Sequence, residues 1–120
     1  MKAKKILYVI THGPYSNADG QEALDAILIG ASFDLDVSVL FIDDGVFQLK
    51  QGQQSFEKGL KPFTNTYKAL EDFGVDNIYL HDLSADARGL CDNELICPVS
   101  KIDSNSVGQL IADQAKVFTF

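Results

Sequence analysis

The chain of 120 residues contains few cysteines, and they are not clustered. Cys91 and Cys97 are the only two, and their separation fits neither a CxxC redox motif nor a four-ligand zinc site. A chain of this length can bury one hydrophobic core without disulfides or metals. We therefore expect a single domain over residues 1–120, with no metal and no cofactor.

Long hydrophobic runs are also missing. No stretch reaches the roughly 18 consecutive apolar residues that cross a membrane. The apolar residues from Ile6 to Ile10 follow N-terminal lysines, but they are fewer than the roughly 7–15 of a secretory signal, and no small-residue cleavage site comes after them. The sequence predicts a cytoplasmic protein without membrane contact.

Positive charge is scarce, because 10 basic residues face 17 acidic ones and the net charge is −7. Binding to nucleic acid needs a basic patch, and the densest basic stretch is only Lys2, Lys4 and Lys5. We expect no direct contact with nucleic acid. Nucleotide-binding and hydrolase motifs (GxxxxGK[ST], GxGxxG, GxSxG, HExxH) are absent as well.

Apolar strand patterns alternate with amphipathic helix patterns along the whole chain. This alternation is typical of a parallel sheet with helices on both faces, so the sequence predicts a three-layer α/β/α sandwich. Residues 46–62 have no regular period and are expected to be irregular. The predicted strands are residues 5–11, 36–42, 75–83, 94–99 and 116–120, and the predicted helices begin at Asp19 and cover 65–74, 84–90 and 104–114.

Four polar residues fall at predicted strand ends, where open α/β sheets place their ligand sites. They are His12, Asp43, Asp44 and His81. Carboxylates and imidazoles could hold a metal ion or act as an acid and a base. Alternatively, Asp44 caps the following turn, Asp43 satisfies backbone donors, and the histidines are ordinary rim residues. No nucleophile accompanies either histidine, so we favour this second interpretation.

An apolar cluster follows Asp44, in a segment without a clear helix or strand period. Monomers seldom expose much apolar surface unless a partner covers it. The side chains could instead fold back onto the edge of the sheet. We predict that they contact another subunit, and the predicted interface residues are Val46, Phe47, Leu49 and Phe56.

Two motifs, "EALDA" at residues 22–26 and "DGVFQL" at 44–49, carry a resemblance that continues through "FTNTYKALEDFGVDNIYL" and "ARGL". With these motifs the chain resembles the TusC/DsrF subunits of the DsrE/DsrF-like superfamily over nearly its whole length. The resemblance implies a five-stranded parallel sheet of order 43215. It also implies a heterohexamer with TusB-like and TusD-like subunits, which relays sulfur from a TusA-like protein to a TusE-like protein for 2-thiolation of the tRNA wobble uridine. Related Dsr complexes serve sulfur oxidation, so both pathways stay open.

The resemblance also bears on the reactive thiol. Sulfur-accepting relatives of the TusD/DsrE type have a cysteine just after the third strand, and aligning "ARGL" places His81 there. A persulfide carrier needs a thiolate, so the alignment implies a non-catalytic partner subunit rather than an enzyme. Two alternatives remain: a small enzyme or ligand-binding domain that uses His12, Asp43, Asp44 and His81 around a metal or phosphate, and a thiol carrier acting through Cys91.

Overall fold

A computed structural model describes the chain at residues 4–12, 19–33, 35–49, 70, 72, 74, 75, 77–90, 95 and 99–120. Its centre is a five-stranded sheet of order β4-β3-β2-β1-β5, in which every neighbouring pair is parallel. The predicted sheet and its strand order are confirmed. The strands are β1 (Lys5–Ile10), β2 (Asp36–Phe41), β3 (Asn77–His81), β4 (Ser100–Ile102) and β5 (Lys116–Thr119).

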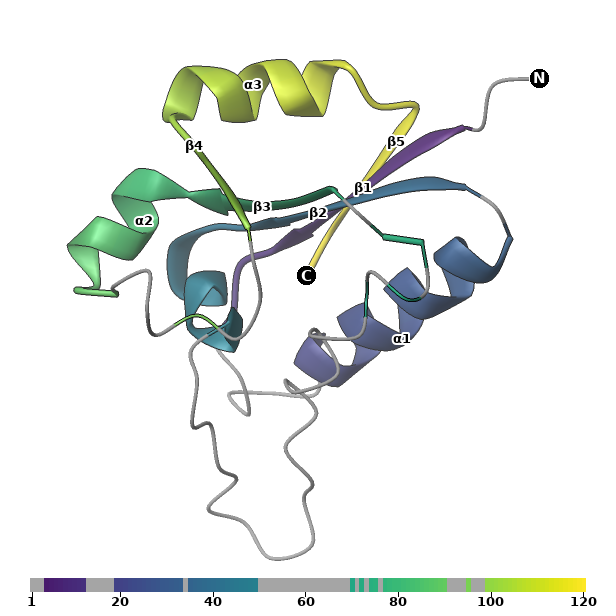
Figure 1. Ribbon diagram of the computed structural model, residues 1–120, viewed down its shortest axis with the longest axis horizontal. Helices are drawn as coiled ribbons and strands as arrows, with labels where there is room; N and C mark the ends of the chain where they lie inside the picture. The colour runs from purple at the N-terminus through teal and green to yellow at the C-terminus, as the bar shows by residue number, and fades with distance from the viewer. Residues whose placement is uncertain are drawn as a thin grey trace, which may run out of the picture.

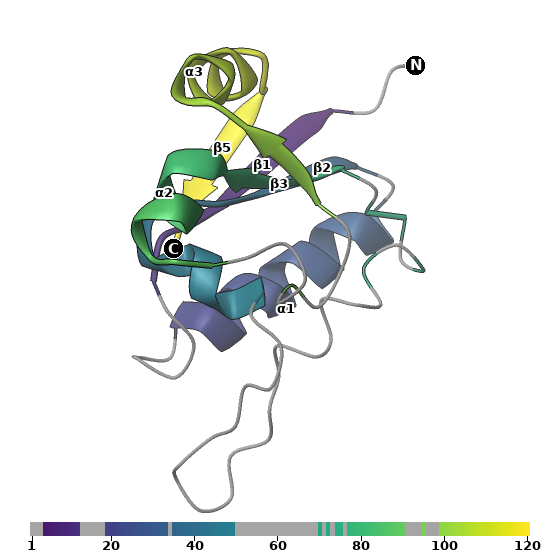
Figure 2. The same ribbon diagram turned by 60° about the vertical axis from the view of Figure 1, so that its left-hand side comes forward.

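Helices cover both faces of this sheet. Figure 1 shows α3 on one face and α1 on the other, and the turned view in Figure 2 keeps them on opposite sides. None of the helices within the described ranges is both long and apolar enough to span a bilayer. The helical elements are α1 (Asp19–Ser32), the 3₁₀ helix η1 (Asp43–Leu49), α2 (Asp82–Ala87) and α3 (Ser104–Ala112).

Alternate residues of the central strands fill two separate cores, because successive strand side chains point to opposite faces. The larger core lies under α1, where Ala23, Leu24 and Ile27 form the buried apolar face of the helix. The smaller core lies under α3, which contributes the buried Val107. On β1, residues 6, 8 and 10 join the first core, while Leu7 and Val9 join the second.

The edge strand β5 is held against β1 by backbone pairing and by aromatic contacts. The ring of Tyr8 stacks on Phe118 with centroids 5.6 Å apart and on Phe120 at 6.3 Å. Thr11 donates two hydrogen bonds to the carbonyl oxygen of Phe120, one from its backbone N–H and one from its hydroxyl, both 2.7 Å long. The predicted terminal strand is therefore present and firmly anchored.

The structure departs from two of the predicted elements. The fourth strand was expected at residues 94–99, but β4 is Ser100–Ile102, and Leu95 forms only an isolated bridge. Residues 46–62 were expected to be irregular, yet residues 46–49 belong to the 3₁₀ helix η1. The spacing of Val46 and Leu49 favours η1, since a 3₁₀ helix brings residues three apart onto one side.

Most of the predicted helix 65–74 lies outside the described residues.

A glycine allows η1 to pass close to the end of β1. The N–H of Ile42 donates to the carbonyl oxygen of Ile10 at 3.0 Å, and the Gly45 backbone lies directly against the same carbonyl group. A Cβ atom at Gly45 would overlap that oxygen. Only glycine fits here without moving the backbone, which explains why the run of apolar residues is interrupted at this point.

We expect Gly45→Ala to destabilise the fold by roughly 1–3 kcal/mol, because the added methyl group must displace backbone rather than a flexible side chain. Urea denaturation followed by circular dichroism measures the change. Gly108→Ala is a matched control in α3, where an added Cβ would meet no atom within 4 Å, and it should stabilise by about 0.5–1 kcal/mol. Similar effects of the two substitutions would contradict the steric explanation.

Candidate functional site

The candidate site lies where the carboxyl ends of β2, β3 and β4 meet η1, α2 and α3. This edge is where ligands bind in open parallel sheets. It contains Asp43, Asp44 and His81 of the four predicted strand-end residues, because η1 follows β2 directly and α2 follows β3 directly. The fourth, His12, follows β1, is exposed, and has its Nδ1 atom 3.2 Å from the hydroxyl of Thr11.

His81 is held on both sides of its ring. Its Nδ1 atom lies 2.7 Å from the hydroxyl of Ser84 in α2, and its Nε2 atom lies 2.9 Å from the hydroxyl of Ser104 in α3. A neutral imidazole donates from one nitrogen and accepts at the other, and a hydroxyl can take either role. The two serines therefore fix the orientation of the ring and can serve both tautomers.

Ser84 connects the histidine to the end of β2. Its side chain is buried, and its hydroxyl oxygen accepts the backbone N–H of Asp43 at 2.9 Å. Asp43 has a φ of 54°, in the left-handed region where Asn and Asp are tolerated better than most residues. The position of Asp43 is thus set by its backbone, while its exposed side chain points away from the core.

Asp44 forms an ion pair with Arg88, which follows α2. The Nε atom of Arg88 donates to Asp44 Oδ1 at 2.9 Å, and its Nη1 atom donates to the carbonyl oxygen of Ser84 at 3.2 Å. The guanidinium therefore ties η1 to α2. Because the Asp44 side chain is largely exposed, this pair contributes little to stability.

The start of α3 completes the site. Asp103 caps this helix by accepting the backbone N–H of Ser106 at 2.8 Å. The backbone N–H of Ser106, and to a smaller extent its hydroxyl, hydrogen-bond to the Asp103 carboxylate and hold the pKa of Asp103 below its usual value. Nearby His81 acts in the same direction. The cap therefore stabilises the folded chain above the ordinary pKa of an aspartate, and this contribution is lost as the pH falls through the lowered pKa.

Among the described residues, metal-ligating side chains do not gather at this edge. In the described part of the chain, no three His, Cys, Asp or Glu side chains come together as possible ligands. His12 contacts Thr11, Asp44 contacts Arg88, and His81 contacts two serines. Both Cys91 and Cys97 lie outside the described residues.

The predicted interface residues separate into different environments. Val46 and Leu49 are fully buried within this chain, in the core under α1, so the expectation that they present an apolar surface to another subunit is wrong for these two. Their spacing of three along η1 turns both toward the sheet. Phe47, between them, is partly exposed, and its contact with another subunit stays a prediction. Phe56 lies outside the described residues.

Gln48 is a structural residue that the sequence did not single out. It is fully buried, and its amide nitrogen donates to the carbonyl oxygen of His12 at 3.0 Å. It thereby holds η1 against the segment that leaves β1. The available signal was a glutamine inside the apolar run "VFQL", since a polar side chain among buried neighbours usually satisfies a backbone group.

A parallel sheet between two helical layers makes this chain a three-layer α/β/α sandwich. Hydrogen-bonded side chains lie at the carboxyl edge of its sheet. The crystal structure of the ychN protein from E. coli has the same fold, with a TM-score of 0.82 at 24% sequence identity. That match covers 98% of this chain and 99% of the other.

The chain belongs to the DsrE/DsrF-like family, whose profile matches residues 4–120. It is 40% identical to the intracellular sulfur oxidation protein DsrF of Allochromatium vinosum, over 98% of this chain and 96% of that protein. It is 35% identical to a protein TusC homolog of Pseudomonas aeruginosa, over 98% of both chains. A protein TusC homolog of Vibrio vulnificus is 28% identical over 97% of this chain and 98% of its own. The predicted family is confirmed.

Proposed function

We propose that this chain is a non-catalytic subunit of a cytoplasmic sulfur-relay complex of the TusBCD type. It assembles with TusB-like and TusD-like subunits into a heterohexamer, and the assembly receives sulfur from a TusA-like protein and passes it to a TusE-like protein. The sulfur ends in the 2-thio group of the 5-methylaminomethyl-2-thiouridine wobble base of tRNA. The chain itself needs no cofactor and contacts neither RNA nor a membrane.

The observation that supports a non-catalytic role is the identity and environment of His81. His81 ends β3, and the resemblance aligns it with the sulfur-accepting cysteine of the TusD/DsrE relatives. Accepting sulfur as a persulfide requires a thiolate that attacks the donor sulfur, and an imidazole does not form such a product. The ring is also engaged by Ser84 and Ser104 on both nitrogens. This arrangement orders the junction of α2 and α3.

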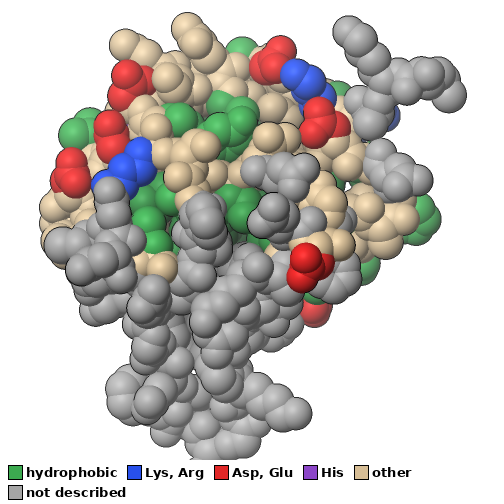
Figure 3. Space-filling model, in the orientation of Figure 1, with side chains coloured by type: hydrophobic (Ala, Val, Ile, Leu, Met, Phe, Trp, Pro, Cys, Tyr) green, Lys and Arg blue, Asp and Glu red, His purple; other side chains and the backbone are tan. Residues whose placement is uncertain are grey.

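The distribution of charge supports contact with proteins rather than with RNA. The net charge is −7, and an RNA-binding surface would need a cluster of basic side chains. On the face shown in Figure 3, the basic atoms are scattered, and acidic atoms lie beside most of them. Two ion pairs of the described residues, Lys5 with Asp113 and Arg88 with Asp44, illustrate how basic groups are neutralised within the chain.

A role in sulfur oxidation is a second candidate, favoured by the higher identity to the DsrF protein than to the TusC homologs. The subunit would then sit in a DsrEFH-type complex, with the same docking role and a different final acceptor. The fold and the strand-end site are compatible with tRNA thiolation and with sulfur oxidation equally, because neither the fold nor the site involves the final sulfur acceptor.

Deleting the gene should separate the two pathways. We expect tRNA from the deletion strain to lose 2-thiouridine, as measured by nucleoside mass spectrometry, and to regain it when the gene is restored. Unchanged 2-thiouridine together with impaired growth on reduced sulfur would instead support the sulfur oxidation candidate.

We expect the isolated chain to remain free of transferred sulfur. Purified protein is incubated with a cysteine desulfurase and cysteine, and intact mass spectrometry then looks for a gain of one sulfur atom. Under the same conditions a co-expressed TusD-like subunit should gain sulfur, which shows that the donor is active. A sulfur adduct on Cys91 or Cys97 of this chain would contradict the non-catalytic role.

Replacing Phe47 should weaken assembly and leave the isolated fold intact. Full burial of a phenylalanine contributes about 1.5–3 kcal/mol, and Phe47 is already partly buried, so Phe47→Ala should weaken the complex by roughly tenfold. Native mass spectrometry of the complex across a dilution series measures the change. Ile111→Ala, at an exposed position of α3, is the control. A complex of unchanged affinity would remove Phe47 from the interface.

A further inference from the structure

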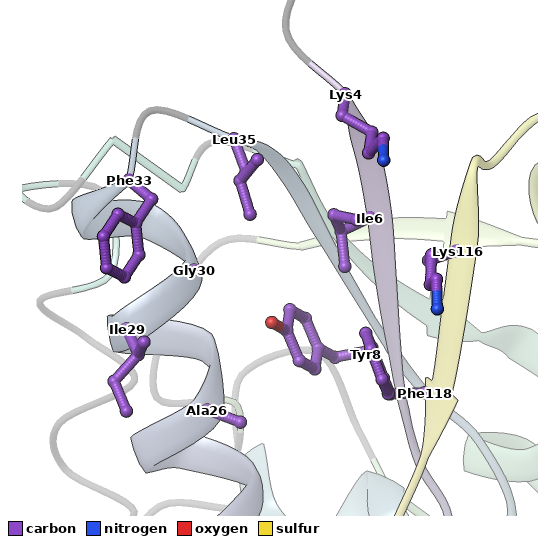
Figure 4. Close-up of a pocket in the computed structure, with 10 residues that line it drawn as sticks. All are labelled: Lys4, Ile6, Tyr8, Ala26, Ile29, Gly30, Phe33, Leu35, Lys116 and Phe118. Carbon is purple, nitrogen blue, oxygen red and sulfur yellow. The ribbon is translucent and has the colours of Figure 1, made fainter.

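An apolar groove opens on the face of the sheet that carries α1. It has a volume of about 410 Å³ and runs between α1 on one side and β1 and β5 on the other (Figure 4). It lies away from the strand-end site, because its lining comes from the start of β1, the last half of α1 with the residues between α1 and β2, and β5. None of the residues discussed under the proposed function lines it.

The groove exists because α1 does not extend over the edge of the sheet. This helix packs on β1 and β2, whereas β5 is an edge strand that pairs only with β1. Tyr8 forms the floor between helix and strand, and its ring tip lies against Gly30, where a Cβ atom would come within 2.8 Å of the tyrosine oxygen. The missing side chain at Gly30 thus makes room for the Tyr8 hydroxyl at the floor of the groove.

Large exposed hydrophobic side chains are concentrated around the groove. Ile29 of α1 is 59% exposed, Phe33, which directly follows α1, is 73% exposed, and Phe118 of β5 is 43% exposed. They are three of the six large hydrophobic side chains that are exposed among the described residues. Apolar groups that gather in one place on a surface usually mark a contact with another molecule. Side chains this exposed form an open groove rather than an enclosed small-molecule cavity.

Charge specifies the occupant further. Lys4 and Lys116 line the strand side of the groove, opposite Ile29 and Phe33 (Figure 4). Within the described part of the chain neither lysine forms an ion pair. A second copy docked with its two-fold axis across the groove would place these lysines against each other, which opposes that self-complementary contact. The groove instead fits an apolar ridge bordered by carboxylates.

We propose that this groove receives an amphipathic helix of a sibling subunit, with apolar side chains against Ile29, Phe33 and Phe118 and acidic side chains against Lys4 and Lys116. Such a helix would lie beside α1 and cover the part of the sheet that α1 leaves open, as in other helix-in-groove contacts. This inference rests on the proposed function, because it supplies the surface by which a docking subunit holds its neighbour.

The test uses the full chain co-expressed with the TusB-like and TusD-like proteins of the same genome. A photo-reactive benzoylphenylalanine at position 33 should crosslink to a helix of one sibling, identified by peptide mass spectrometry. Phe33→Ala and Lys116→Glu should each weaken the complex by roughly tenfold or more. Leu83→Ala, at a residue of α2 that is 59% exposed, and Lys101→Glu, on the opposite edge strand, are the matched controls and should leave the affinity unchanged. Melting temperatures of the isolated variants exclude loss of folding.

The outcomes are distinct. If the complex forms but position 33 gives no crosslink and Phe33→Ala binds as the unaltered chain does, the groove assignment is wrong while the proposed function stands. If the unaltered chain forms no complex with either sibling, the proposed function fails and this inference falls with it. A crosslink from position 33 to a second copy, or an amphiphile retained in the native mass of the isolated chain, would overturn the assignment in favour of that occupant.

Discussion

The close approach of η1 to the carboxyl end of β1 is the constraint on which the arrangement of the strand-end site depends. Because Gly45 has no side chain, the η1 backbone can lie against the carbonyl group of Ile10. That placement brings the N–H of Asp43 to the hydroxyl of Ser84, which in turn orients His81. The hydrogen bond from Asp43 to Ser84, and with it the orientation of His81, thus follows from a steric condition within η1.

Most of the fold could be predicted from periodicity, because buried parallel strands and an amphipathic helix leave strong apolar patterns. The pattern failed where it was weak or ambiguous. The exposed edge strand β4 has few apolar residues, so the sequence predicts the strand at the more hydrophobic residues 94–99 instead. In η1 only Val46 and Leu49 reveal the 3₁₀ spacing, and two positions are too few to distinguish a short helix from an exposed apolar loop.

The site was predictable in position but not in its contacts. Strand ends can be predicted from the sequence, so His12 and His81 are both candidates, and the sequence alone does not distinguish the two histidines. The structure distinguishes them, because His81 meets Ser84 from its own following helix and Ser104 from another element, while His12 stays exposed. The contact with Ser104 depends on how β4 and α3 pack, which no local pattern encodes. Family membership carries the functional proposal further than the side chains alone do.

The pairing of β1 with β5 has a consequence for how the polypeptide acquires its structure during synthesis. β1 lies between β2 and β5, and Tyr8 stacks on Phe118 from the far end of the described chain. The second edge of β1 therefore stays unpaired during synthesis until residues 116–119 have left the ribosome. A long closure of this kind slows folding and leaves an open strand edge on the nascent chain. Loss of residues 116–119 would convert that transient edge into a permanent template for aggregation.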